Sequence, residues 1–337
     1  MIDRILIVGY GSVGKRHLRL ARGLLPTAEI RVLRHQKCID VPEYANACLS
    51  SLDDAIFFAP HIAVIANPAT FHLSVALPLA QAGVHLLVEK PLAASLEGVD
   101  DLIAACRDHN TVLMTAYNLR FLPSLQRFRK LFIDGHIGRV LSVRSEIGQY
   151  LPSWRSDADY RSSVSARKDL GGGALLELSH ELDYLRWIFG NVEWVQATVR
   201  QQSDLDVDVE DTAHLVLGFE PDRSGNQLIA ALNVDFIRHD TTRNCTAIGE
   251  MGSLRWEGLT GVVAHYEAGG TNWHELFRRE HELDGSYLAE WRDFLACIDG
   301  QRSPAVTGED GRNVLQIIQA ARRSSESGNT TIVVETQ

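Results

Sequence analysis

The sequence has 337 residues, which is long for one hydrophobic core and predicts two domains. Its formal net charge of -10 argues against a nucleic-acid partner, because a protein that binds a phosphate backbone needs a basic face. No apolar stretch reaches the roughly 18 residues that would suggest a membrane span. The five cysteines are scattered without a CxxC pair, so we expect no disulfide framework, no metal site and a cytoplasmic location.

The first 120 residues alternate short apolar runs with helix-length amphipathic segments, which is the pattern of βαβ units. Such units build a parallel sheet, so we expect an α/β domain over residues 1–120. The predicted strands cover residues 5–8, 29–33, 62–66, 85–88 and 111–116, and the predicted helices cover 14–25, 73–82 and 96–109.

Beyond residue 120 the strands follow one another with turns between them, which favours an antiparallel sheet. We expect residues 121–337 to form an α+β domain with a large, open, mostly antiparallel sheet, used for substrate binding and oligomerisation. The predicted strands cover residues 140–146, 194–200, 214–219, 228–235 and 331–334, and the predicted helices cover 174–189, 287–297 and 311–327.

A glycine-rich loop joins the first predicted strand to the first helix and contains Gly9, Tyr10, Gly11, Ser12, Val13 and Gly14. Gly9 permits the tight turn, Gly11 lets the backbone approach a pyrophosphate, and Gly14 lets the helix pack closely on the strand. The helix N-terminus supplies free N–H groups for the phosphates. An ordinary glycine turn is the alternative, but the context predicts a dinucleotide-binding Rossmann domain with these six residues against the cofactor.

The end of the second predicted strand bears on the choice of cofactor. An acidic residue there would bind the ribose 2′-OH of NAD, but Arg34 follows the strand and Lys37 lies close by. A guanidinium suits a 2′-phosphate, so NADP is favoured over NAD. The alternative is a solvated basic turn, since an arginine can also stack on adenine without a phosphate.

Two further motifs follow predicted parallel strands, where open α/β sheets bind their ligands. The first motif contains Asn67, Pro68, Thr70 and His72, and the second contains Glu89, Lys90 and Pro91. A lysine at a strand end can stabilise a developing alkoxide or polarise a carbonyl. A surface lysine that caps a loop is the alternative for Lys90.

With these motifs in this order, the chain resembles the glucose-fructose oxidoreductase, inositol dehydrogenase and rhizopine-catabolism (Gfo/Idh/MocA) family. The resemblance extends to Tyr117, Asn118 and Arg120, to Gly171, Gly172 and Gly173, to Glu177, His180 and Asp183, and to residues 304–311. It implies NAD(P)-linked oxidation or reduction of a hydroxyl or carbonyl on a sugar, cyclitol or nucleotide sugar. It also implies that Asn118 and Arg120 join the cofactor site, and that Lys90 lies beside the nicotinamide and precedes a cis proline.

His180 is the candidate general base, because hydride transfer from a carbinol requires a group that takes the hydroxyl proton. Glu177, His180 and Asp183 are three residues apart and would share one face of a helix. The family pattern has an aspartate four residues before the histidine, whereas this chain has Leu176 there and Glu177 one residue later. The alternative is a structural histidine, and Asp183 is expected to hold structure or bind a substrate hydroxyl.

The segment before this helix is rich in aromatic and basic side chains that can stack on a sugar and bind an anion. We favour an anionic or nucleotide-linked sugar; a crossover loop or an oligomer contact is the alternative. The expected substrate-binding residues are Tyr117, Trp154, Arg155, Tyr160, Arg161 and Asp183. A homodimer or homotetramer is expected, because one face of an open sheet needs cover.

Two other functions are compatible with the same scaffold. One is reduction of a C=C or C=N bond, and the other is a non-catalytic cofactor-sensing or repressor protein. Lys90, Glu177 and His180 together favour carbonyl chemistry over both alternatives.

Overall fold

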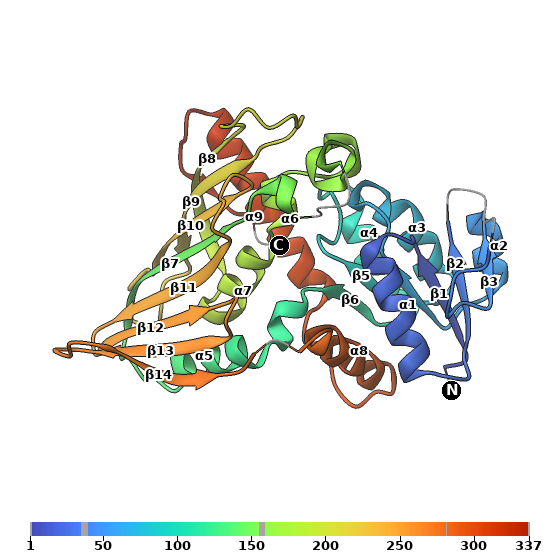
Figure 1. Ribbon diagram of the computed structural model, residues 1–337, viewed down its shortest axis with the longest axis horizontal. Coiled ribbons are helices and arrows are strands. Elements are labelled where there is room, and N and C mark those ends of the chain that lie inside the picture. Colours follow the sequence, from blue (N-terminus) through green and yellow to red (C-terminus); the bar gives the residue numbers. More distant parts are fainter. Residues whose placement is uncertain (1, 35–39, 155–158, 281, 336–337) are drawn as a thin grey trace. The chain divides into compact units, whose positions relative to one another are not determined.

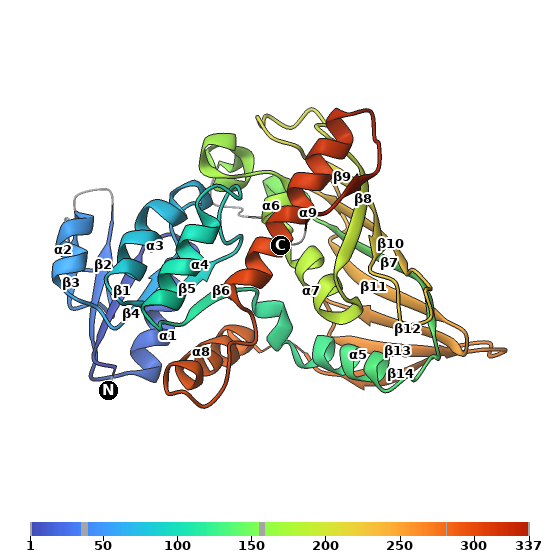
Figure 2. The same cartoon turned by 180° about the vertical axis from the view of Figure 1, so that it is seen from behind.

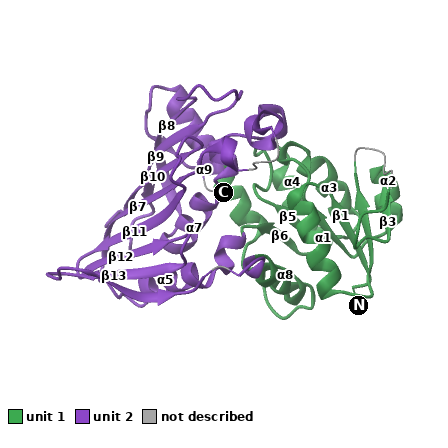
Figure 3. Ribbon diagram, viewed as in Figure 1, with its two compact units in different colours: residues 1–117, 287–315 green, residues 118–286, 316–337 purple. Residues whose placement is uncertain are grey.

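The computed structural model describes residues 2–34, 40–154, 159–280 and 282–335 (Figure 1). The chain forms two compact units, coloured separately in Figure 3: unit 1 comprises residues 1–117 and 287–315, and unit 2 comprises residues 118–286 and 316–337. The chain passes from unit 1 to unit 2 after residue 117, returns to unit 1 for residues 287–315 and ends in unit 2. Lys37 and Arg155 lie outside the described residues.

Unit 1 contains a six-stranded, fully parallel sheet, which confirms the expected Rossmann-like α/β fold. Apart from Arg4, its central strands β1 and β4 are apolar and buried, as expected for a parallel sheet that helices cover on both faces. The strand order is β3-β2-β1-β4-β5-β6. The strands are β1 (Arg4–Val8), β2 (Glu29–Leu33), β3 (Ala47–Leu49), β4 (Ile62–Ile65), β5 (His85–Glu89) and β6 (Leu113–Ala116).

The chain leaves β1 toward one edge of this sheet and leaves β4 toward the other edge. Because βαβ crossovers are right-handed, α1 and α3 lie on opposite faces of the sheet (Figures 1 and 2). The strand order therefore reverses between β1 and β4, which is where such sheets bind ligands at their carboxyl ends. The helices of this unit are α1 (Ser12–Leu24), α2 (Leu52–Phe57), α3 (His72–Gln81), α4 (Val99–Asp108) and α8 (Gly285–Ile298).

Unit 2 is built on a nine-stranded sheet that is antiparallel except for the β7/β10 pair, which confirms the expected large, mostly antiparallel sheet. The strand order is β14-β13-β12-β11-β7-β10-β9-β8-β15. The strands are β7 (Val140–Gly148), β8 (Val192–Arg200), β9 (Thr212–Phe219), β10 (Ile229–Asp235), β11 (Thr242–Gly249), β12 (Gly252–Glu257), β13 (Val262–Glu267), β14 (Trp273–Arg278) and β15 (Ile332–Val333).

Helices cover one face of this sheet, so alternate strand residues are buried and exposed. On β9 and β10, Leu215 and Leu232 are buried, whereas Val216 and Asn233 on the other face are exposed. The helices of this unit are α5 (Pro123–Ile133), α6 (Ala174–Glu177) and α7 (His180–Phe189), and α9 (Gly308–Glu326) contributes residues to both units.

Several elements were not predicted from the sequence: the strands β3 and β11 to β14 and the helices α2 and α5. Polar strands explain part of this result, since β14 is mostly exposed and has no alternating apolar pattern. The single helix predicted at 174–189 is wrong, because Leu178 and Ser179 form a turn that separates α6 from α7.

Within the described part of the chain, no helix combines the length and the apolarity that a membrane span requires. The described residues also contain no group of three or more His, Cys, Asp or Glu that could hold a metal ion. Cys106, Cys245 and Cys297 are buried free thiols. Cys48 is disulfide-bonded, which the scattered spacing of the cysteines did not lead us to expect.

Candidate functional site

The glycine loop has the geometry of a phosphate cradle. Gly9 has a φ of +90°, and a Cβ there would lie 2.6 Å from the Ala66 carbonyl oxygen. A Cβ on Gly14 would collide with the Gly9 carbonyl, so both positions require glycine. A Cβ on Gly11, by contrast, would meet no atom within 4 Å, and this space would admit a pyrophosphate against the backbone.

The N-terminus of α1 suits the same ligand. Gly11 occupies the N-cap position without a side-chain hydrogen bond, and the first turn contains no acidic residue. The amide groups of this turn therefore face the loop with their partial positive charge. Ser12 is exposed and Val13 is half-buried. The loop thus fits the dinucleotide that its sequence predicted.

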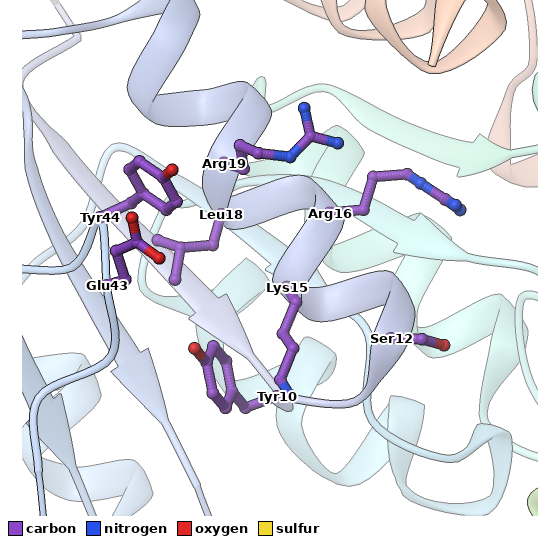
Figure 4. Close-up of a pocket in the computed structure, with 8 residues that line it drawn as sticks. All are labelled: Tyr10, Ser12, Lys15, Arg16, Leu18, Arg19, Glu43 and Tyr44. Carbon is purple, nitrogen blue, oxygen red and sulfur yellow. The ribbon is translucent and has the colours of Figure 1, made fainter. Parts of the chain in front are cut away.

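A cavity of about 310 Å³ lies beside the loop, and Tyr10 is one of the residues that line it (Figure 4). The Arg34 guanidinium lies 5.0 Å and the Lys15 ammonium 5.1 Å from the centroid of the Tyr10 ring. Two cations that share one ring form a local positive field that suits a phosphate. The cavity is lined by Tyr10, Ser12, Lys15, Arg16, Leu18, Arg19, Glu43 and Tyr44.

His72 connects the two motifs that follow β4 and β5. Its ring is buried, with Nε2 2.8 Å from the Asn67 carbonyl oxygen and Nδ1 3.1 Å from the Pro91 carbonyl oxygen. Burial lowers the pKa of His72, although the backbone contacts oppose this shift. The His72 ring therefore contacts both loops inside unit 1, and in its neutral form it donates to one of the two carbonyls. Pro68 begins the turn after β4, and Thr70 within it is exposed.

The Lys90–Pro91 peptide bond is cis, which confirms the expectation for this motif. Lys90 is half-buried at the carboxyl end of β5. Glu89 beside it is buried and accepts hydrogen bonds from the Lys90 amide at 3.1 Å and from His17 Nε2 at 2.8 Å. Burial alone would raise the pKa of Glu89, but these hydrogen bonds and the Lys90 charge lower it below its usual value.

The candidate acid–base groups of unit 2 do not lie on one helix. Glu177 is the last residue of α6 and His180 is the first residue of α7, so the expected continuous helical face is wrong. Glu177 accepts a hydrogen bond from the Ser165 hydroxyl at 3.0 Å. His180 is half-buried at the N-terminus of α7.

Several residues expected to contact cofactor or substrate are bound to partners within unit 2. Arg120 and Asp183 are buried and form a two-pronged ion pair, with N–O distances of 2.9 and 2.6 Å. The Asn118 side-chain amide donates to the Ser286 hydroxyl at 2.9 Å. The ion pair with Arg120 is compatible with a structural role for Asp183. Tyr117, in unit 1, is completely buried.

The described residues of the polar and aromatic segment, Trp154, Tyr160 and Arg161, have partners within unit 2. The Trp154 ring meets Phe236 edge-on at 5.2 Å between centroids, and its indole N–H donates to the Gln149 carbonyl. The Tyr160 hydroxyl accepts a hydrogen bond from the Asp206 amide at 3.2 Å, and Arg161 pairs with Asp159 at 2.9 Å.

Three residues near the candidate site were missed in the sequence: Lys15, His17 and Trp291. Lys15 lies one turn into α1 and could have been suspected as a basic residue behind a phosphate loop. His17 shares the buried stripe of α1 with Gly14, Leu18 and Ala21. A polar residue in an apolar stripe was a usable signal. Trp291 gave no usable signal in the sequence, because its helix was assigned to the C-terminal domain, over residues 121–337.

Two family models match nearly the whole chain. The model described as "Oxidoreductase family, NAD-binding Rossmann fold" matches residues 4–117. The model described as "Oxidoreductase family, C-terminal alpha/beta domain" matches residues 129–334. Each match covers the greater part of one structural unit.

The chain is also similar to individual oxidoreductases. The chain is 36% identical to levoglucosan dehydrogenase from Pseudarthrobacter phenanthrenivorans over 141 residues, which cover 41% of this chain and only 35% of that enzyme's length. It is 28% identical to myo-inositol 2-dehydrogenase from Thermotoga maritima over 276 residues, covering 78% and 77% of the two chains. The fold matches the WlbA dehydrogenase from Bordetella pertussis, solved with NADH and UDP-GlcNAcA, with a TM-score of 0.80, 24% identity and 100% coverage of both chains.

Proposed function

This chain belongs to the Gfo/Idh/MocA oxidoreductase family, and we propose that it transfers a hydride between a nicotinamide cofactor and a carbinol or carbonyl carbon of a sugar, cyclitol or nucleotide sugar. The observation that carries this proposal is a shared sheet edge. The glycine loop follows β1 and Lys90 follows β5, at the carboxyl ends of strands that both pair with β4. A phosphate cradle and a cationic group for the reacting oxygen thus lie on one ligand-binding edge.

NADP is proposed as the preferred cofactor. Arg34 stands where an acidic residue would bind the ribose 2′-OH of NAD, and Lys15 is a second cation near the Tyr10 ring. A phosphate within reach of these side chains would form charge-assisted hydrogen bonds.

The proposed chemistry needs two groups from the protein. The bound nicotinamide supplies the hydride acceptor at C4. In the oxidation direction, the His180 ring takes the hydroxyl proton while the Lys90 ammonium stabilises the negative charge that develops on the substrate oxygen. Glu177 lies three residues before His180 and is proposed to support its ring, directly or through the turn between α6 and α7.

We propose a sugar with an anionic or nucleotide-linked group as the substrate. The loop that carries Trp154 and Tyr160 offers rings for stacking, and Arg161 at its end is exposed. Relatives of the chain are named dehydrogenases of levoglucosan and myo-inositol, and the WlbA structure contains a nucleotide sugar. Of these compounds, the nucleotide sugar belongs to the proposed substrate class, whereas levoglucosan and myo-inositol are neutral.

A turnover assay with a matched panel tests the proposal. The protein is incubated with NAD or NADP and with neutral sugars, cyclitols, uronic acids and nucleotide sugars, while reduced nicotinamide is followed by its absorbance. We expect turnover with at least one member and a large loss of kcat in Lys90→Met, because the variant keeps the length of the side chain but lacks the charge. Tight cofactor binding without turnover on any member would favour a cofactor-sensing protein instead.

A further inference from the structure

His17 is a buried histidine that the proposed chemistry does not use. It lies on the inner face of α1 with no exposed surface, and its surroundings come from two distant parts of unit 1. Glu89 at the end of β5 lies on one side of the ring. Trp291 of α8 contacts the other ring nitrogen, and the Tyr287 ring, also of α8, lies edge-on at 5.8 Å between centroids.

The partners of His17 determine where its proton lies. The Trp291 indole nitrogen is 2.9 Å from His17 Nδ1, and an indole N–H can only donate a hydrogen bond. Nδ1 must therefore accept, and the proton of the ring resides on Nε2. That Nε2–H donates to Glu89 Oε1 at 2.8 Å.

The hydrogen bonds continue to the backbone of Lys90. The other carboxylate oxygen of Glu89, Oε2, accepts the Lys90 amide N–H at 3.1 Å. Three hydrogen bonds thus connect the indole of Trp291 with the residue proposed to act on the substrate. A buried network in which every donor has an acceptor can fix geometry that a single contact would leave loose.

The surroundings concentrate the negative charge on Glu89. Glu290 on α8 is also completely buried, and burial together with the carboxylates of Glu89 and Asp293 raises its pKa well above the usual value. Burial thus disfavours the charged form of Glu290, while the hydrogen bonds to Glu89 favour the charged form of Glu89. Of these two buried carboxyls, the one that receives His17 and Lys90 is the one whose contacts favour the anion.

We propose that His17 is a positioning residue: locked in one tautomer by Trp291, it fixes Glu89 and, through Glu89, the backbone of Lys90. This inference rests on the proposed function for its effect on turnover, but the hydrogen-bond relay itself belongs to the protein without ligands. In this proposal His17 does not contact the substrate. It contributes to turnover by fixing the position of Lys90.

Three variants separate positioning from general stability. His17→Leu removes the relay, and we expect kcat to fall about 10²-fold, the typical cost of misplacing a reacting group, with the cofactor Kd near wild type. His17→Gln restores a donor to Glu89 and should recover about tenfold of that loss. Phe294→Leu is the matched control, because this buried ring packs edge-on against Trp291 outside the relay and should lower Tm without lowering kcat.

A readout without substrate or cofactor tests the relay directly. Nitrogen-15 NMR of the ligand-free protein at neutral pH should show the Nε2–H tautomer of His17. The indole N–H resonance of Trp291 should shift in His17→Leu and keep its position in a variant of a histidine that belongs to unit 2, such as His214→Ala. An Nδ1–H tautomer or a doubly protonated ring would overturn the proposal, because either state leaves the Trp291 N–H without its acceptor.

The activity measurements and the NMR measurement test different parts of the proposal. Wild-type kcat in folded His17→Leu, or equal losses in His17→Leu and Phe294→Leu, would overturn the positioning role. If no member of the panel supports turnover in the wild-type enzyme, the proposed function fails, and the tautomer of His17 still decides whether the relay exists.

Discussion

Tyr10 presents one ring to two cations, and this residue-scale arrangement leads to a prediction about cofactor choice. We expect NADP(H) to bind more tightly than NAD(H), because a charge-assisted phosphate contact contributes about 1.5 to 3 kcal/mol. Arg34→Ala should erase the preference, since it removes the guanidinium that lies 5.0 Å from the ring centroid. Calorimetry with both cofactors measures the difference.

Arg31→Ala is the matched control for this measurement. Its guanidinium also stacks on an aromatic ring, 4.2 Å from the centroid of Phe58, but belongs to β2 outside the Tyr10 cavity. The control should keep the preference of the wild-type protein. Tighter binding of NAD(H) than NADP(H) by the wild-type protein would refute the assignment.

His180 gives the second prediction at this scale. If His180 is the general base, His180→Ala should lower kcat by about 10² to 10⁴-fold and leave cofactor affinity near wild type. His214→Ala is a suitable control, because this exposed histidine on β9 bonds to Asn233 on the neighbouring strand β10, and both residues are exposed. Full activity in His180→Ala would assign the proton to another group or to water.

The residues that could be predicted from the sequence are those whose role depends on local geometry. Gly9 and Gly14 are required by the turn and by close packing, and Lys90 follows from its place at a strand end. His17 could not be assigned in this way. Its role depends on Trp291, which is 274 positions away in the sequence, and no local pattern encodes such a contact.

At the scale of elements, α8 carries a buried carboxyl that should make stability depend on pH. Neither carboxyl oxygen of Glu290 has a hydrogen-bond partner among the described residues, and the pKa of Glu290 is raised. An acid with a raised folded-state pKa contributes full stability below its unfolded value of 4.5, and that stability is lost as pH rises toward the folded value. Each unit of the shift corresponds to about 1.4 kcal/mol.

Glu290→Gln should therefore flatten this dependence. Urea unfolding at about pH 5 and about pH 8 should show a smaller loss of stability at the higher pH than in the wild-type protein, because an amide does not ionise. Glu326→Gln, at the exposed end of α9, should keep the wild-type difference. If Glu290→Gln leaves the difference in the free energy of unfolding between the two pH values unchanged, ionisation of Glu290 costs the folded protein little stability, which would contradict the prediction.

Most elements of unit 1 were predicted because they have a strong local signal, such as the apolar runs of β1, β4 and β5, whereas the short β3 and α2 were missed. The strands β11 to β14 lack that signal, since their register is set by neighbouring strands rather than by their own apolar pattern. The division between α6 and α7 was also missed. A turn at Leu178 and Ser179 contains neither glycine nor proline, so no residue marked it.

For the whole molecule, the open face of the large sheet leads to a prediction about assembly. Val216 lies at the middle of β9 with 36% of its surface exposed, and its strand neighbours include Gln196 and Ala231. A sheet face that no helix covers is a natural surface for self-association. We expect a homodimer or homotetramer at micromolar concentration by light scattering.

Val216→Asp should shift the protein toward the monomer, because it places a charge in the middle of this face. Phe57→Asp, at a 92% exposed position at the end of α2, is the control and should leave the mass unchanged. A monomeric wild-type protein would mean that this contact does not form. An assembly that Val216→Asp leaves intact would mean that the subunits associate through another surface.

The central claim is that a hydride passes directly between a carbinol carbon and the nicotinamide under the charge of Lys90. The most direct test uses the substrate found in the panel with deuterium on its carbinol carbon, followed by mass spectrometry of the reduced cofactor. The account predicts one deuterium at nicotinamide C4, formed slowly or not at all by Lys90→Met. Reduced cofactor without deuterium, or reduction only of C=C or C=N compounds, would contradict it.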